Sequence, residues 1–315
     1  MSSIDDSSGL LALGMKTVIL TPLRALARKC RQVAQRRQRA RLKQQPPIEP
    51  SAFAAILQRL GLRRGMTVFV HSAWENMIPI RSGPLEVIHL LQDAVGENGT
   101  LLMPCYSYVR GTDGVFDLRW APTSAGLLAE AFRRSKGVRR SANNHSVSAL
   151  GRQATELVQD HHHSLTSWDG HSPFMKMREL ESLVICLGLP HSFGLGTHLH
   201  CADSMLYYEF EYFRRLFGPV VEIPCRLEDG TRLVLRHRHR LPRFFPNRTR
   251  GYFDPRRIVV FNESGIRFQS VAAPYLIDRI IELGRHGYVN YHLPFPARRL
   301  WRKPVDMPAA ALATL

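Results

Sequence analysis

Hydrophobic residues recur along the chain with two distinct periods. Apolar runs at 66–71, 100–105 and 183–189 are six or seven residues long and show little polar alternation, which is typical of strands buried on both faces. The segments 84–96 and 270–284 instead repeat their apolar residues with the period of a helix. Buried strands separated by helices predict an α/β protein whose sheet is covered on both faces.

Capping and turn residues delimit further helices. Ser51 is expected to cap a helix over 52–60 that Gly61 ends. Hydroxyl residues are expected to open another helix over 123–135, where the apolar residues lie on one face. Both segments therefore add to the helical layers around the predicted sheet.

The second half of the chain combines helical and strand patterns. Residues 203–217 predict a helix, and Glu228-Asp229-Gly230 predicts a hairpin turn between two strands. We see no internal repeat. We therefore expect a single three-layer α/β/α domain over residues 49–315, preceded by a basic extension over residues 1–48 that is flexible or amphipathic.

The formal net charge of +17 comes from two segments. Residues 16–45 hold ten Lys and Arg and no acid, and residues 212–257 hold twelve Arg against four acids. The first segment is interpreted as a solvated, partly helical tail; an alternative is an arm that associates weakly with an anionic membrane surface. No specific nucleic-acid binding is expected, because no recognition module accompanies the tail.

Cysteine usage and hydropathy predict a cytoplasmic protein. The five cysteines are odd in number and form no C-x-x-C pair, which favours a reducing compartment. No apolar run is long enough to span a bilayer, and the apolar segment 9–23 is interrupted by Lys16 and Pro22. An alternative is a cytoplasmic protein that associates with the membrane surface through its N-terminal tail.

Polar residues follow several predicted strands at once. His71-Ser72 and Cys105-Tyr106-Ser107 come directly after apolar runs, and GTHLHCAD at 196–203 follows the third. Ligands in open α/β sheets bind at the carboxyl ends of strands, so these residues are candidates for one site. The set in GTHLHCAD suits a metal site, a thiol nucleophile or a histidine base.

The metal and thiol alternatives have the weaker support. His198, His200 and Asp203, with His161–His163 or the pair His237 and His239, do not form a complete ligand set at standard spacing. We therefore expect no metal, and interpret the triple-histidine run as a solvated loop. Adjacent helical residues diverge, so Cys201 is expected to be a buried filler rather than a thiol activated by His200.

Eight segments of the chain resemble, in their order, the aminoglycoside 3-N-acetyltransferase family, whose members use acetyl-CoA and do not have the GNAT fold. The segments are VHSA (70–73), GTLLMP (99–104), F-D (116–117), PTSAGLLAEAFRR (122–134), GVRRSANNHSVSALG (137–151), SPF (172–174), LVICLGL (183–189) and T-x-x-H-x-x-D (197–203). The resemblance implies an acyltransferase that moves acetyl from acetyl-CoA to an amine of an aminoglycoside-type or other amino-sugar acceptor, as in antibiotic resistance.

The resemblance also implies roles for particular residues. His200 matches the catalytic histidine, and Asp203 matches the glutamate that orients it. The segments that line the coenzyme channel contain His71, Ser72, Thr123, Ser124, Arg140, Ser141 and Ser146. The chain departs from the family at Asp203, which is one methylene shorter, and at Asn143-Asn144, where relatives often carry His-Pro.

The chemistry of acetyl transfer agrees with these roles. The acceptor amine must lose a proton, and a histidine with an ordinary pKa near 6.5 can take it when amine and thioester are bound together. A carboxylate on the other ring nitrogen fixes the tautomer, and positions 200 and 203 share a face if a helix begins there.

Two interpretations of the basic segment after the motif stay open: a solvated face or interface, and an acceptor that is anionic rather than a polycationic drug. The segment 236–257 is rich in arginine, which repels polycations and suits phosphate or carboxylate groups. Two alternative functions stay open: a metal-dependent hydrolase, and a non-catalytic relative that binds coenzyme A or a glycan.

Overall fold

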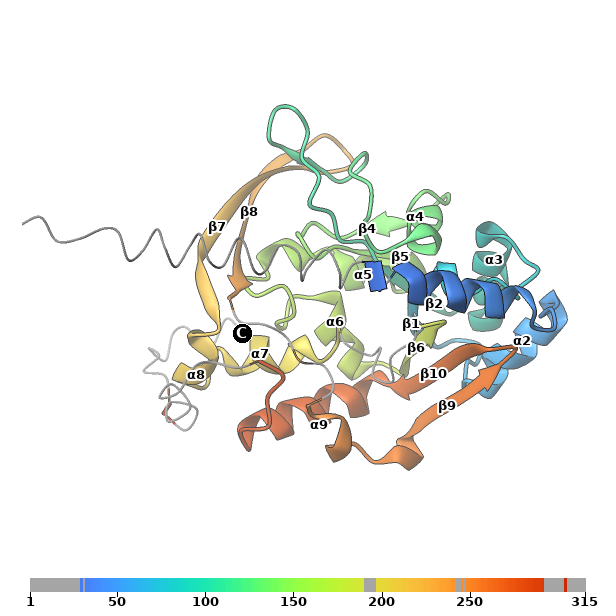
Figure 1. The fold of residues 1–315 in the computed structure, drawn as a ribbon. Helices are drawn as coiled ribbons and strands as arrows, with labels where there is room; N and C mark the ends of the chain where they lie inside the picture. The colour runs from blue at the N-terminus through green and yellow to red at the C-terminus, as the bar shows by residue number, and fades with distance from the viewer. Residues whose placement is uncertain are drawn as a thin grey trace, which may run out of the picture.

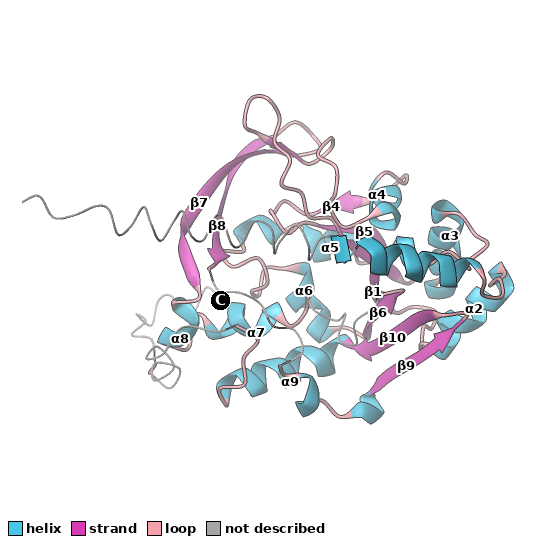
Figure 2. Ribbon diagram, viewed as in Figure 1, coloured by secondary structure: helices cyan, strands magenta, loops and turns pink. Residues whose placement is uncertain are grey.

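The computed structural model describes residues 29–30, 32–189, 197–241, 245, 248–291 and 303–304 of the chain. A mixed seven-stranded sheet of order β4-β5-β2-β1-β6-β10-β9 forms its centre (Figures 1 and 2). The three predicted apolar runs form its parallel part: β1 (Thr67–Ser72), β2 (Thr100–Pro104) and β6 (Ser182–Leu187).

Antiparallel strands extend this parallel centre on both sides. On one side β5 (Val147–Gly151) pairs with β2 and carries β4 (Arg139–Arg140). On the other side β10 (Ile266–Ala272) pairs with β6 and carries β9 (Ile258–Glu263). The sequence reading missed these outer strands, because they are short or carry polar residues among the apolar ones.

Helices cover both faces, so the predicted three-layer α/β/α architecture is confirmed. Alternate strand residues point to opposite faces: Val68 and Val70 pack with α2 (Pro50–Arg59), α3 (Pro84–Val95) and α4 (Leu127–Arg133). Phe69 points to the other face. The elements packed there are α5 (Ala154–Val158), α6 (Pro173–Lys176), α7 (His200–Leu206) and α9 (Ala273–Arg285).

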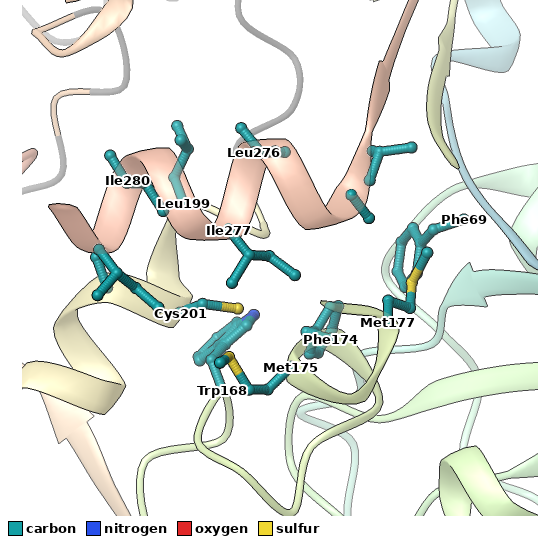
Figure 3. Packing of buried hydrophobic residues seen from close by; sticks show 14 of the residues in the cluster. Phe69, Trp168, Phe174, Met175, Met177, Leu199, Cys201, Leu276, Ile277 and Ile280 are labelled. Carbon is teal, nitrogen blue, oxygen red and sulfur yellow. The ribbon is translucent and has the colours of Figure 1, made fainter. Parts of the chain in front are cut away.

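The core beneath α9 holds helix α7 in place. In Figure 3, Ile277 of α9 projects toward Cys201 and the Trp168 ring, and Leu276 and Ile280 of the same helix belong to the same cluster. All five side chains are buried. This packing fixes α7 against α9 and so sets the position of the residues that α7 carries.

The predicted hairpin is present and forms a second, smaller sheet. Strands β7 (Phe217–Arg226) and β8 (Arg232–Arg240) are antiparallel, and β3 (Phe116–Asp117) pairs with β7. Figure 2 shows the hairpin as a long arm beside the main sheet. Its own small core includes Phe116, Ile223 and Leu235.

Four predicted helices differ from the structure. The one expected over 270–284 begins only at Ala273, because residues 270–272 belong to β10. Ser51 does not cap α2: the helix begins at Pro50, whose fixed φ suits a first turn, after the N-cap residue Glu49. The predicted 203–217 helix is split between α7 and α8 (Glu211–Arg214), and its last residue already belongs to β7. Backbone turns at 207–210 separate the two helices.

Helix α4 begins later than expected, at Leu127. The hydroxyl groups of Thr123 and Ser124 do not cap it, because they donate to the carbonyl of Tyr106 at 3.0 and 3.3 Å. Gly126, with φ +100°, takes the N-cap position instead. The remaining short helices are 3-10 turns at Trp74–Asn76, His161–His163, Met177–Glu179, Arg250–Tyr252 and Pro255–Arg257.

The packed domain reaches further toward the N-terminus than residue 49. Residues 32–43 are helical, and Leu42 and Ile48 are buried in the core with Phe53. A boundary between tail and domain at 48/49 stays a prediction, and residues 1–28 lie outside the described chain. Among the described residues, no helix is both long and apolar enough to cross a bilayer.

Replacing Leu42 tests this N-terminal packing. Leu42→Ala is expected to lower the free energy of unfolding by about 2–3 kcal/mol, because the side chain is buried. Val33→Ala, on the same helix but 47% exposed, is the control and should change it by less than about 0.5 kcal/mol. Urea denaturation measures both; equal effects would show that Leu42 is not part of the core.

Candidate active site

Helix α7 brings His200 and Asp203 to one face. The Nδ1 atom of His200 lies 3.8 Å from Oδ2 of Asp203, and the side chains are 15% and 4% exposed. The two residues of the predicted dyad are therefore neighbours. Their separation is longer than an ordinary hydrogen bond.

The hydroxyl of Tyr291 is closer to the histidine. It lies 3.0 Å from Nδ1 of His200, although the two residues are 91 positions apart in the chain. The Tyr212 hydroxyl donates to the Tyr291 carbonyl at 3.1 Å and so fixes the segment that follows α9. Sequence reasoning missed Tyr291, because no motif surrounds it and only the packing of α9 on α7 brings it here.

Asp203 forms a buried ion pair with Arg240. The guanidinium Nε lies 3.5 Å from Oδ2, and the side chains are 8% and 4% exposed. Arg240 also donates to the His200 carbonyl and to the Ser204 hydroxyl, both at 3.0 Å. The end of β8 is thereby joined to the first turn of α7.

Burial shifts the protonation of both dyad residues. Burial first, and then the charge of Arg240, hold the pKa of His200 well below its usual 6.5. Burial raises the pKa of Asp203 to about 7, although the attraction of Arg240 acts in the opposite direction. The imidazole is therefore neutral at pH 7, the form in which it accepts a proton.

Aromatic rings surround His200. The Trp168 ring lies 4.8 Å from it between centroids, the His145 ring packs on Trp168 at 4.3 Å, and Tyr106 lies 5.8 Å from His145. The Tyr106 hydroxyl is 2.9 Å from Oγ1 of Thr197, the first residue of the T-x-x-H-x-x-D motif. The carboxyl end of β2 therefore borders the His200 site, as the polar strand ends predict.

The predicted coenzyme residues lie in three places. His71 and Ser72 end β1; His71 is buried against Phe69, and burial lowers its pKa to about 4. Thr123 and Ser124 lie before α4 and bind the backbone at the end of β2. They are placed so that they brace the loop rather than cap a helix.

Arg140, Ser141 and Ser146 are buried and hydrogen-bonded within the protein. Arg140 donates to the carbonyls of Cys105, Leu118 and Ala121 at 2.6–3.0 Å. The Ser141 hydroxyl contacts Nδ1 of His161, and the Ser146 hydroxyl donates to the Asn143 carbonyl. These side chains support the loops near the site, and their contact with a coenzyme stays a prediction.

The remaining reactive side chains of the motif are core residues. His198 is buried against Phe69, and its Nε2 lies 3.5 Å from the Met177 sulfur. Burial raises the pKa of the Cys201 thiol, so it stays protonated. In the described parts of the chain, no three His, Cys, Asp or Glu side chains are grouped so that they could hold a metal ion.

The triple-histidine run is not a solvated loop. His161 is fully buried in a 3-10 turn, where its ring contacts the Ser141 hydroxyl and the Ser167 carbonyl. The interpretation from sequence was wrong for this residue, because polar composition does not reveal that a serine and a carbonyl satisfy a buried imidazole. His163 is exposed.

Comparison with known proteins identifies the family. Residues 69–239, more than half of the chain, match the family described as aminoglycoside 3-N-acetyltransferase, and the chain belongs to that family. Aminoglycoside N(3)-acetyltransferase IV of Salmonella sp is 34% identical over 151 residues, which is 47% of this chain and 56% of the relative. The match thus spans little more than half the length of that relative.

Solved structures of two relatives show the same fold. Aminoglycoside acetyltransferase AAC(3)-IVa in complex with a gentamicin superposes with a TM-score of 0.65 at 24% identity, over 79% of this chain and 93% of that one. The binary complex of AAC-IIIb with CoASH gives 0.63 at 21% identity, over 78% and 99%.

Removing Arg240 tests the buried ion pair. Arg240→Gln is expected to lower the free energy of unfolding by about 3–5 kcal/mol, because Asp203 loses its cation in a buried place. The loss should grow as the pH rises through 7, where Asp203 becomes ionised. Arg236→Gln is the control on the same strand: its pair with Glu222 is exposed and contributes less than about 1 kcal/mol.

Denaturation with urea at pH 5.5 and pH 8.5 measures both variants. A loss for Arg240→Gln at pH 8.5 as small as that of Arg236→Gln, or a loss that does not grow between the two pH values, would show that the buried pair does not stabilise the site.

Proposed function

We propose that the protein transfers acetyl from acetyl-CoA to the amine of an amino sugar, with His200 as the general base. The observation that carries the proposal is the buried imidazole of His200, kept neutral beside Arg240 and held at Nδ1 by the Tyr291 hydroxyl. Membership of the acetyltransferase family and the complex of its relative AAC-IIIb with CoASH support the same reaction.

The reaction proceeds by direct attack with both substrates bound. The amine nitrogen attacks the thioester carbonyl carbon while Nε2 of His200 takes the amine proton. The new N–C bond forms and the C–S bond breaks. The proton then passes from His200 to the departing thiolate, so that the products are the N-acetyl sugar and free coenzyme A.

Tyr291 and Asp203 share the task of positioning the base. For Nε2 to accept a proton, Nδ1 must carry its own hydrogen, which it donates to the Tyr291 oxygen at 3.0 Å. Asp203, 3.8 Å away and paired with Arg240, contributes charge that stabilises the imidazolium. This division accommodates an aspartate that is one methylene shorter than the family glutamate.

The arginine-rich strand β8 reaches His200 through Arg240, which supports an anionic acceptor. Burial first, and then the charge of Arg240, lower the pKa of His145, whose ring packs on Trp168 beside His200. The Nε2 atoms of His237 and His239 lie 2.9 Å apart on β8. An amino sugar that carries phosphate or carboxylate would be attracted here, whereas a polycation would be repelled.

Replacing His200 tests the base. His200→Ala is expected to lower kcat about 100- to 10,000-fold, measured as release of free thiol from acetyl-CoA with a panel of amines. In the unchanged protein, the acid limb of kcat/KM should lie below pH 6.5, because burial lowers the pKa of His200. Retained turnover in the variant with acetyl-CoA bound would rule out the assignment.

The same panel tests the acceptor. We expect a higher kcat/KM for a nucleotide-linked amino sugar than for a kanamycin-type drug, and a preference that weakens with salt. Burial, and to a smaller extent the nearby charge of Arg110, lower the pKa of His237 and His239. Arg110→Gln should therefore reduce kcat/KM for the anionic acceptor more than for glucosamine, which carries no anionic group. If only the drug were acetylated efficiently, the proposal of an anionic acceptor would be wrong, whereas the proposal of acetyl transfer would still hold.

Replacing Tyr291 tests the positioning. Tyr291→Phe keeps the ring and removes the hydroxyl, so kcat should fall about five- to tenfold, the value of one hydrogen bond. Nitrogen NMR of His200 should show a smaller fraction of the Nδ1–H tautomer. Asp203→Asn, in comparison, should lower kcat more than it weakens coenzyme binding. An unchanged tautomer in Tyr291→Phe would mean that the phenol only packs.

A further inference from the structure

The helix over residues 32–43 concentrates positive charge on the surface. It carries five cations, and the chain has no acid between residues 29 and 48. The cations are Arg36, Arg37, Arg39, Arg41 and Lys43, and all five are exposed. Within the described part of the chain, none of these side chains forms an ion pair, whereas Arg59, Arg133 and Arg285 on other helices are each paired with a glutamate.

This helix gains little stability from within the protein. Arg37 and Arg41, and Arg39 and Lys43, are four residues apart, a spacing at which like charges destabilise a helix. Leu42 is the buried residue that the helix contributes to the core. Twelve residues with one apolar anchor are marginal in water, so an external anionic surface would stabilise this helix.

Apolar side chains lie next to one row of these cations. Arg36, Arg39 and Lys43 line one side of an open groove of about 590 Å³, and the loop that follows β1 lines the other with Trp74 and Ile78. A tryptophan beside basic residues is the combination that favours the boundary between lipid headgroups and acyl chains. The helix is drawn in dark blue in Figure 1, along the outside of the main body.

We propose that helix 32–43 and its groove form a docking surface for an anionic lipid membrane. Charge complementarity with the headgroups supplies most of the attraction, and Trp74 and Ile78 add apolar contact. The sequence that precedes the helix is also suited to a membrane surface, because nine of the fifteen residues at 9–23 are Ala, Val, Ile, Leu or Met and Lys16 is the one charged residue. A nucleic-acid backbone would match the cations but neither of these apolar features.

Vesicle cosedimentation with the full chain tests the proposal. The protein is expected to bind phosphatidylcholine vesicles that contain phosphatidylglycerol, to bind pure phosphatidylcholine vesicles much less, and to dissociate in about 1 M salt. The triple variant Arg36→Gln, Arg39→Gln, Lys43→Gln keeps good helix formers in place. At about fivefold for each lost cation, it should bind roughly 100-fold more weakly.

A matched variant separates this surface from overall charge. Arg152→Gln, Arg232→Gln, Arg248→Gln removes three exposed arginines from other elements and should leave vesicle binding within about twofold. Thermal melts of both triple variants confirm that they fold. Equal weakening by the two, equal binding to neutral vesicles, or binding to duplex DNA but not to vesicles would each overturn the proposal.

Discussion

The buried pair between Asp203 and Arg240 is the constraint on which the site depends. A carboxylate with 4% exposure is costly unless a cation accompanies it, and here the cation comes from the last residue of β8. The same guanidinium binds the His200 carbonyl and lies over the Trp168 ring at 4.5 Å. One side chain thus joins the hairpin, helix α7 and the Trp168 ring, and its charge adds to burial in keeping His200 neutral.

Hydrophobic patterning predicted the parallel strands at the centre of the main sheet but not the antiparallel strands at its two edges. The three parallel strands and α3 agree with the sequence reading to within a residue or two, because continuous apolar runs and regular helical periods leave few alternatives. The 203–217 segment was wrong as one helix, since its apolar residues serve two short helices and the start of β7. Local pattern does not reveal where a chain turns to meet a distant strand.

The site was predictable where it lies within one motif. His200 and Asp203 are three residues apart on α7, so their proximity follows from helical geometry. Tyr291 and Arg240 come from elements that are distant in sequence, and their contacts with α7 depend on tertiary packing. Arg140, which the family resemblance places in a segment lining the coenzyme channel, donates to three carbonyls that shape the loop, a role that the sequence did not reveal.

The position of Tyr291 has a consequence for how the site is completed during synthesis. His200, Asp203 and Arg240 leave the ribosome well before the phenol, which follows α9. Because α7 packs against α9, the ion pair also reaches its buried position only once this later part of the chain has been made. The contact between the phenol and Nδ1 therefore forms only after α9 and the segment that follows it have docked, so the surroundings of His200 are completed by one of the last described parts of the chain to be made.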